Sequence, residues 1–123
     1  MSKECIFING VPFYYEKETL NYDVCEAMNL DEAKILLRTV KKLFHEKGLD
    51  FYLAFGTLLG AIREHDLISG DEDLDIFIDN ESKLLDILPY LSENGLKLIR
   101  ALEGNTYSFR LGTHSYIDVY ILR

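Results

Sequence analysis

The sequence has few cysteines, no tryptophan and no long apolar run. Its two cysteines, Cys5 and Cys25, share no CxxC spacing and have no histidines clustered beside them, so neither a disulfide scaffold nor a zinc site is expected. No apolar stretch approaches the roughly 20 residues of a membrane-spanning helix, and the N-terminus does not resemble a signal peptide. We therefore expect a cytoplasmic protein with no membrane span.

Basic residues and prolines are also scarce. The chain has 13 Lys and Arg against 21 Asp and Glu, for a formal net charge of -8. Nucleic-acid binders need a basic surface, so a nucleic-acid partner is disfavoured. Hydrophobic residues make up 48% of the 123 residues, which is enough for the core of one domain. With two prolines and no Ser/Gly-rich linker, residues 1–123 are expected to form a single minimal domain.

Hydrophobic periodicity and turn residues predict an α/β fold of the α+β kind, with a mixed β-sheet flanked by helices. Asn9-Gly10 is typical of a two-residue hairpin turn and predicts an N-terminal β-hairpin over residues 5–15. Asn29 and Glu32 form a capping-box pattern before a long amphipathic helix that Gly48 ends. Strands are expected over 49–55, 74–78, 96–103, 106–111 and 115–122.

Two further helices are expected between these strands. A short helix over 58–64 precedes a polar loop over 65–72. A longer helix starts after Asn80 or Ser82 and runs to about Asn94, where Gly95 stops it. Pro89 lies inside this helix and should bend or break it.

Acidic residues are crowded around the predicted strand 74–78. Asp73 and Asp75 alternate along it, which puts both carboxylates on one face with Cα atoms about 7 Å apart. Such crowding calls for a cation, and Mg²⁺ binds one or two carboxylates together with substrate phosphates. By itself an Asp-x-Asp pair is also typical of an acidic, solvated edge strand. Six acids fall within residues 71–81: Asp71, Glu72, Asp73, Asp75, Asp79 and Glu81.

Two other patterns are compatible with phosphate chemistry. Gly56-Thr57 lies between a strand and a helix, where free backbone N–H groups and the threonine hydroxyl can bind phosphate, although the motif alone is more typical of an ordinary turn capped by Thr57. Asp118 shares one face of the last strand with Tyr116 and Tyr120. If that strand lies beside the Asp73 strand, Asp118 completes a carboxylate triad able to hold metal ions; otherwise it is an exposed residue of an outer strand.

Together, Gly56-Thr57, Asp73-Leu-Asp75 and Asp118 resemble the nucleotidyltransferase fold superfamily, which includes DNA polymerase β. Gly56-Thr-Leu-Leu-Gly-Ala-Ile-Arg63 and Asp71-Glu-Asp-Leu-Asp75 narrow the resemblance to the LicD family, which includes bacterial phosphocholine transferases. This similarity is clearest from about residue 31 to residue 79. The chain departs from the family pattern at Ser69-Gly70, where the family has Pro-Trp, and at Glu72, where it has a second Asp.

The resemblance implies roles for six residues. Asp73, Asp75 and Asp118 would be catalytic and would bind Mg²⁺ or Mn²⁺, with Asp118 as the third ligand or as the base for the acceptor hydroxyl. The donor phosphates would lie against Gly56 and Thr57. Arg63 would reach a phosphate, or alternatively form a surface ion pair with a neighbouring acid.

The resemblance also implies a reaction. A LicD-like transferase would move a phospho-alcohol such as phosphocholine from a CDP-linked donor to a glycan or small-molecule acceptor. A minimal nucleotidyltransferase that moves a nucleoside monophosphate from an NTP to a small molecule or protein stays open. A non-catalytic nucleotide-binding domain that needs a partner subunit is the third alternative.

Overall fold

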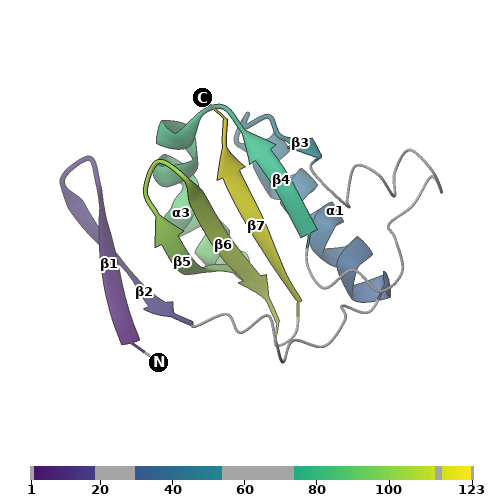
Figure 1. Ribbon diagram of the computed structural model, residues 1–123, viewed down its shortest axis with the longest axis horizontal. Coiled ribbons are helices and arrows are strands. Elements are labelled where there is room, and N and C mark those ends of the chain that lie inside the picture. Colours follow the sequence, from purple (N-terminus) through teal and green to yellow (C-terminus); the bar gives the residue numbers. More distant parts are fainter. Residues whose placement is uncertain (1, 19–29, 54–73, 113–114, 123) are drawn as a thin grey trace.

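The computed structural model describes residues 2–18, 30–53, 74–112 and 115–122. An N-terminal hairpin forms a two-stranded sheet, and a five-stranded sheet with the order β3-β4-β7-β6-β5 forms the body of the molecule (Figure 1). The elements are β1 (Ser2–Ile8), β2 (Val11–Lys17), α1 (Leu30–Glu46), β3 (Tyr52–Leu53), β4 (Leu74–Ile78), α3 (Glu81–Glu93), β5 (Leu96–Leu102), β6 (Thr106–Leu111) and β7 (Ser115–Ile121).

The five-stranded sheet is mixed. β4 runs parallel to β7, while the pairs β3–β4, β5–β6 and β6–β7 are antiparallel. Helices α1 and α3 both lie against the same face of this sheet (Figure 1). The predicted fold class is therefore confirmed: a mixed sheet with helices and an N-terminal β-hairpin. No helix in the described part of the chain is long and apolar enough to cross a membrane.

Helix α1 packs through the apolar face that its sequence periodicity predicts. Leu36, Val40 and Phe44 are fully buried and recur every four residues. The helix ends in a Schellman motif: Gly48 has φ +70, its N–H donates to the His45 carbonyl, and the Leu49 N–H donates to the Phe44 carbonyl at 2.9 Å.

The strand predicted over 49–55 is shorter in the described residues than expected. Leu49 is 3% exposed and lies just beyond α1, where its N–H is bonded to the last turn of that helix. Strand β3 therefore begins only at Tyr52.

Helix α3 begins as predicted, with the Asn80 side chain accepting a hydrogen bond from the Lys83 N–H at 3.0 Å. The predicted break at Pro89 is wrong, because the helix continues to Glu93. Pro89 is exposed, and its missing hydrogen bond is outweighed by the burial of apolar neighbours on the sheet side of the helix. These buried neighbours are Leu84, Ile87, Leu88 and Leu91.

Alternation along the strands separates two faces of the sheet. Ile76 on β4 and Ile117 and Val119 on β7 are fully buried and belong to the core cluster shared with the helices. The residues between them, Asp75 and Asp118, project from the opposite face. The fold thus places an apolar core on one side of β4 and β7 and carboxylates on the other.

The N-terminal hairpin turns at Asn9 and Gly10, whose φ angles are +52 and +82 as a tight hairpin turn requires. Its Ile6 is 5% exposed and joins the core. The Asn9 side-chain amide donates to Asp86 on α3 at 3.1 Å, and the Glu18 N–H donates to the Ile99 carbonyl on β5 at 2.9 Å. The hairpin is therefore fixed to α3 at its tip and to β5 at its base.

Candidate functional site

Asp75 and Asp118 lie directly opposite each other on neighbouring parallel strands. Adjacent strands are about 4.8 Å apart, and residues in register point to the same side of a sheet. The sequence left open whether the strand of Asp118 lies beside the strand of the Asp-x-Asp pair, and the strand order shows that it does. The two acidic side chains therefore lie next to each other on the sheet face opposite the helices.

The Asp118 carboxylate is held by the next strand of the sheet. Asp118 is 1% exposed, and its Oδ1 accepts a hydrogen bond of 2.6 Å from the Ser108 hydroxyl on β6. Ser108 is itself fully buried and is in register with Asp118. A buried carboxylate needs such a donor, because it has lost its hydrogen bonds to water. Ser108 therefore fixes the orientation of the carboxylate.

Arg100 on β5 brings positive charge to the same carboxylate. Its Nη2 lies 3.6 Å from Asp118 Oδ1, and its side chain is 24% exposed. The β5–β6 register shifts between Leu98 and Arg100, so Leu98 lies opposite Phe109 while Arg100 lies opposite Ser108. This irregularity puts Arg100 on the face of Ser108 and Asp118, although simple alternation would put it on the face of Leu98.

Aromatic side chains and Arg110 surround the acidic pair. The rings of Phe77 on β4 and Tyr120 on β7 have centroids 5.7 Å apart. Arg110 lies over the ring of Tyr116 at 5.9 Å and pairs with Glu18 from the end of the hairpin at 3.0 Å. Arg100 and Arg110 therefore each face an acidic side chain, Asp118 and Glu18 respectively.

The other residues expected at this site lie outside the described residues: Asp73, Gly56, Thr57 and Arg63. Their roles stay predictions. Within the described ranges, no group of three or more Asp, Glu, His or Cys residues is close enough together to hold a metal ion. Of the three expected ligands, the structure brings together Asp75 and Asp118.

The chemistry of this pair suits a hard divalent cation. Two carboxylates face one guanidinium, so the described groups leave a net negative charge at a largely buried place. Mg²⁺ and Mn²⁺ are bound through carboxylate oxygens, commonly one or two of them together with substrate phosphates. The residues present therefore fit such an ion.

Ser108 is the residue that sequence reasoning did not single out. The signal was available in the two strands predicted on either side of Gly112-Thr113. Pairing them as a hairpin puts Ser108 opposite Asp118, as the structure shows. Arg100 carried no such signal for this role, because its position depends on the irregular β5–β6 register.

Comparison with known proteins identifies the family of the chain. The family model described as the LicD/FKTN/FKRP nucleotidyltransferase domain matches residues 48–123, which is more than half of the chain. The chain belongs to this family. No curated protein matches the chain.

The LicD match covers the later part of the chain and leaves out the first 47 residues. The match starts later than residue 31, where the resemblance was expected to begin, and it extends through Asp118. It therefore contains the acidic pair together with Ser108 and Arg100. The hairpin β1–β2 and helix α1 precede it.

Proposed function

We propose that this LicD-family protein is a Mg²⁺-dependent transferase that moves a phospho-alcohol, such as phosphocholine, from a CDP-linked donor to a hydroxyl of a glycan or small molecule. The observation that supports this function is the register of Asp75 against Asp118 on two adjacent parallel strands. The family to which the chain belongs carries a nucleotidyltransferase domain. Phosphoryl transfer depends on positioning and on neutralising phosphate charge, and carboxylates collected at one point can hold a cation that contributes to both.

In the proposed reaction, an acceptor oxygen attacks the phosphorus that carries the alcohol. The new P–O bond forms, the anhydride bond to CMP breaks, and CMP leaves with the bonding electrons. The hydroxyl proton passes to water or to a carboxylate oxygen of Asp118. A divalent cation bound at the carboxylates would neutralise and orient the donor phosphates.

In this proposal, separate groups of residues bind the cation, bind the donor phosphates and position Asp118. Asp73, Asp75 and Asp118 hold the cation, and Gly56, Thr57 and Arg63 bind the donor phosphates. Ser108 and Arg100 act on Asp118 rather than on substrate, because both contact its Oδ1. They are positioning residues that keep the carboxylate facing Asp75.

Product analysis tests this proposal. The purified chain, incubated with CDP-choline, Mg²⁺ and a panel of sugar acceptors, is expected to release CMP and form a choline phosphodiester, both visible by ³¹P NMR. Asp75→Asn removes one ligand charge with little change in volume and should abolish the release. Asp79→Asn, at an exposed acid just after β4, is the matched control and should remain active.

Other donors decide between this reaction and its alternatives. Release of pyrophosphate from CTP or ATP, with none of CMP from CDP-choline, would replace the proposed reaction with nucleoside monophosphate transfer. Binding of nucleotide without turnover of any donor would contradict both reactions and indicate a binding domain. Thr57→Ala should weaken donor binding more than it lowers the free energy of unfolding.

A further inference from the structure

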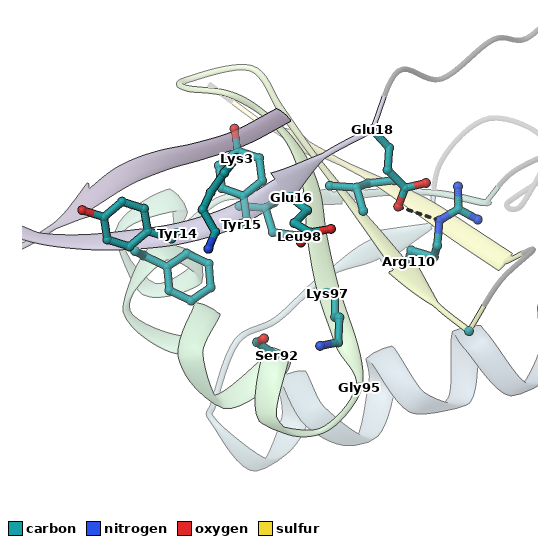
Figure 2. Close-up of a pocket in the computed structure, with 13 residues that line it drawn as sticks. Lys3, Tyr14, Tyr15, Glu16, Glu18, Ser92, Gly95, Lys97, Leu98 and Arg110 are labelled. Carbon is teal, nitrogen blue, oxygen red and sulfur yellow. Dashed lines mark hydrogen bonds and ion pairs between the residues drawn. The ribbon is translucent and has the colours of Figure 1, made fainter. Parts of the chain in front are cut away.

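A pocket of about 620 Å³ lies between the N-terminal hairpin, β5 and the end of α3 (Figure 2). It contains neither Asp75 nor Asp118. One wall comes from hairpin residues that precede the LicD match, and the opposite wall comes from residues within that match. Its lining includes Lys3, Tyr14, Glu18, Ser92, Lys97 and Arg110.

The pocket is lined by three cations, Lys3, Lys97 and Arg110, and by two carboxylates, Glu16 and Glu18, so its lining has an excess of one positive charge although the chain as a whole carries -8. Lys97 on β5 lies in register with Arg110 on β6, so two cations are direct cross-strand neighbours, which is unfavourable unless something balances them. Glu18 forms an ion pair with Arg110. Lys3 and Lys97 form no ion pair with a described residue, and both side chains extend into the same space (Figure 2).

Aromatic and hydroxyl groups accompany these cations. Tyr14 is 61% exposed and lines the pocket with Phe13, while Ser92 lies on the side of α3. Aromatic faces stack against the C–H faces of sugar rings, and hydroxyls exchange hydrogen bonds with sugar hydroxyls. A ligand with both a sugar ring and an anionic group would satisfy all of these groups.

The pocket adjoins the acidic pair through Arg110. Arg110 lines the pocket and lies over Tyr116, which is two residues before Asp118 on β7. It is also two residues after Ser108, about 7 Å along β6 from the residue that holds Asp118. The Arg110 end of the pocket is therefore one cross-strand residue pair away from Ser108 and Asp118 along the sheet.

We propose that this pocket binds the acceptor and that the acceptor is a saccharide bearing a negatively charged group, either a phosphate ester or a carboxylate. The assignment as acceptor rests on the proposed transferase function. The preference for a negatively charged saccharide rests only on the residues that line the pocket. The hairpin thereby becomes a specificity element added in front of the LicD domain.

Calorimetric titration of the full chain in the absence of Mg²⁺ tests the pocket. Glucose 6-phosphate or glucuronate is expected to bind more tightly than glucose and than inorganic phosphate, and raised salt should weaken that binding. Tighter binding of glucose 6-phosphate would identify the anionic group as a phosphate ester, and tighter binding of glucuronate would identify it as a carboxylate. Equal affinity for glucose, equal affinity for inorganic phosphate, or no binding of either acid would overturn the proposal.

Variants locate the binding. Lys97→Gln and Lys3→Gln should each raise the Kd for the preferred acid about tenfold, the change that corresponds to about 1.4 kcal/mol. Lys42→Gln removes an exposed lysine of α1 outside the pocket and should leave the Kd unchanged. Equal effects of all three substitutions would contradict the location.

The acceptor assignment is separated from the transferase proposal by Asp75→Asn. This variant should bind the anionic saccharide as tightly as the natural chain, even though nucleotide binding is expected to fail. If saccharide binding is retained in a protein that turns over no donor, only the transferase function fails. If donor turnover occurs with acceptors that do not bind the pocket, only the pocket assignment fails.

Discussion

The orientation of the Asp118 carboxylate depends on two neighbouring side chains. The Ser108 hydroxyl and the Arg100 guanidinium reach the same carboxylate oxygen from two successive strands. Alternation in the sequence predicted the face of Asp118 and its tyrosine neighbours, because period two follows from strand geometry alone. It did not predict Arg100, whose side chain reaches that face only through the irregular pairing of β5 with β6.

Ser108→Ala is expected to lower the free energy of unfolding by about 1 kcal/mol, because a buried carboxylate oxygen loses its hydroxyl donor. Denaturant unfolding with and without the substitution measures this loss. Ser82→Ala, at an exposed serine of α3, is the control and should change stability little. A Ser108→Ala protein as stable as the natural chain would contradict the assigned hydrogen bond.

Tyr107 offers a test through pH. It is fully buried, and its hydroxyl donates to Glu81 Oε2 at 2.5 Å. Burial is the main cause that raises the pKa of its phenol, and the hydrogen bond to Glu81 raises it further. The folded protein therefore keeps the Tyr107 proton, while the unfolded chain releases it above about pH 10. This contribution to stability is present below that pH and is lost as the pH rises toward the folded value.

Tyr107→Phe should accordingly flatten the decline of unfolding free energy between about pH 9 and 11, besides lowering stability at neutral pH by about 1 kcal/mol. Chemical denaturation across this pH range is the measurement. Tyr52→Phe, at a tyrosine of β3 that is 49% exposed, is the matched substitution for comparison. Identical slopes for the natural chain and Tyr107→Phe would show that Tyr107 does not hold its proton in the fold.

At the scale of elements, local signals predicted the helices and strands better than their ends. Gly48 marks the end of α1, but the same Schellman motif takes Leu49 into the helix terminus and shortens the strand that was expected to follow. Pro89 suggested a break because local propensity is all that sequence shows, whereas packing of the buried face keeps α3 continuous. The first boundary is set by backbone hydrogen bonds at the helix terminus, and the continuity of α3 is set by tertiary packing.

The hairpin turn gives a prediction at this scale. A Cβ added at Gly10 would meet nothing within 4 Å, so any cost of substitution comes from its φ of +82. Gly10→Ala should lower stability by about 1 kcal/mol, and Gly10→Asn should cost less, because asparagine tolerates this conformation. Thermal unfolding of the three proteins measures the order. Equal melting temperatures for the two variants would contradict a backbone origin of the cost.

For the whole molecule, the decisive feature is the parallel pairing of β4 with β7. The two strands are separated in the chain by α3, β5 and β6, so no local pattern could predict that they are neighbours. The resemblance to a known family implied only that Asp118 is a third metal ligand and left the strand order open, and the topology brings Asp75 and Asp118 together. The apolar periodicity nevertheless indicated the buried faces of the sheet, because β4, β5, β6 and β7 each place alternate apolar residues in the core cluster.

Cation binding should be visible as a change in the stability of the whole fold. A cation that binds only the folded chain adds about 2.7 kcal/mol to the free energy of unfolding at roughly one hundred times its Kd. Mg²⁺ is therefore expected to raise the melting temperature of the natural chain and leave Asp75→Asn unchanged. An equal rise in both proteins would show that the ion binds elsewhere.

The most direct measurement is calorimetric titration of the chain with CDP-choline, CTP and ATP, each with and without Mg²⁺. The account predicts nucleotide binding that requires Mg²⁺, prefers CDP-choline, and disappears in Asp75→Asn while Asp79→Asn still binds. Binding that is independent of Mg²⁺, or that survives loss of the Asp75 carboxylate, would contradict the claim that Asp75 and Asp118 form the metal site of a transferase.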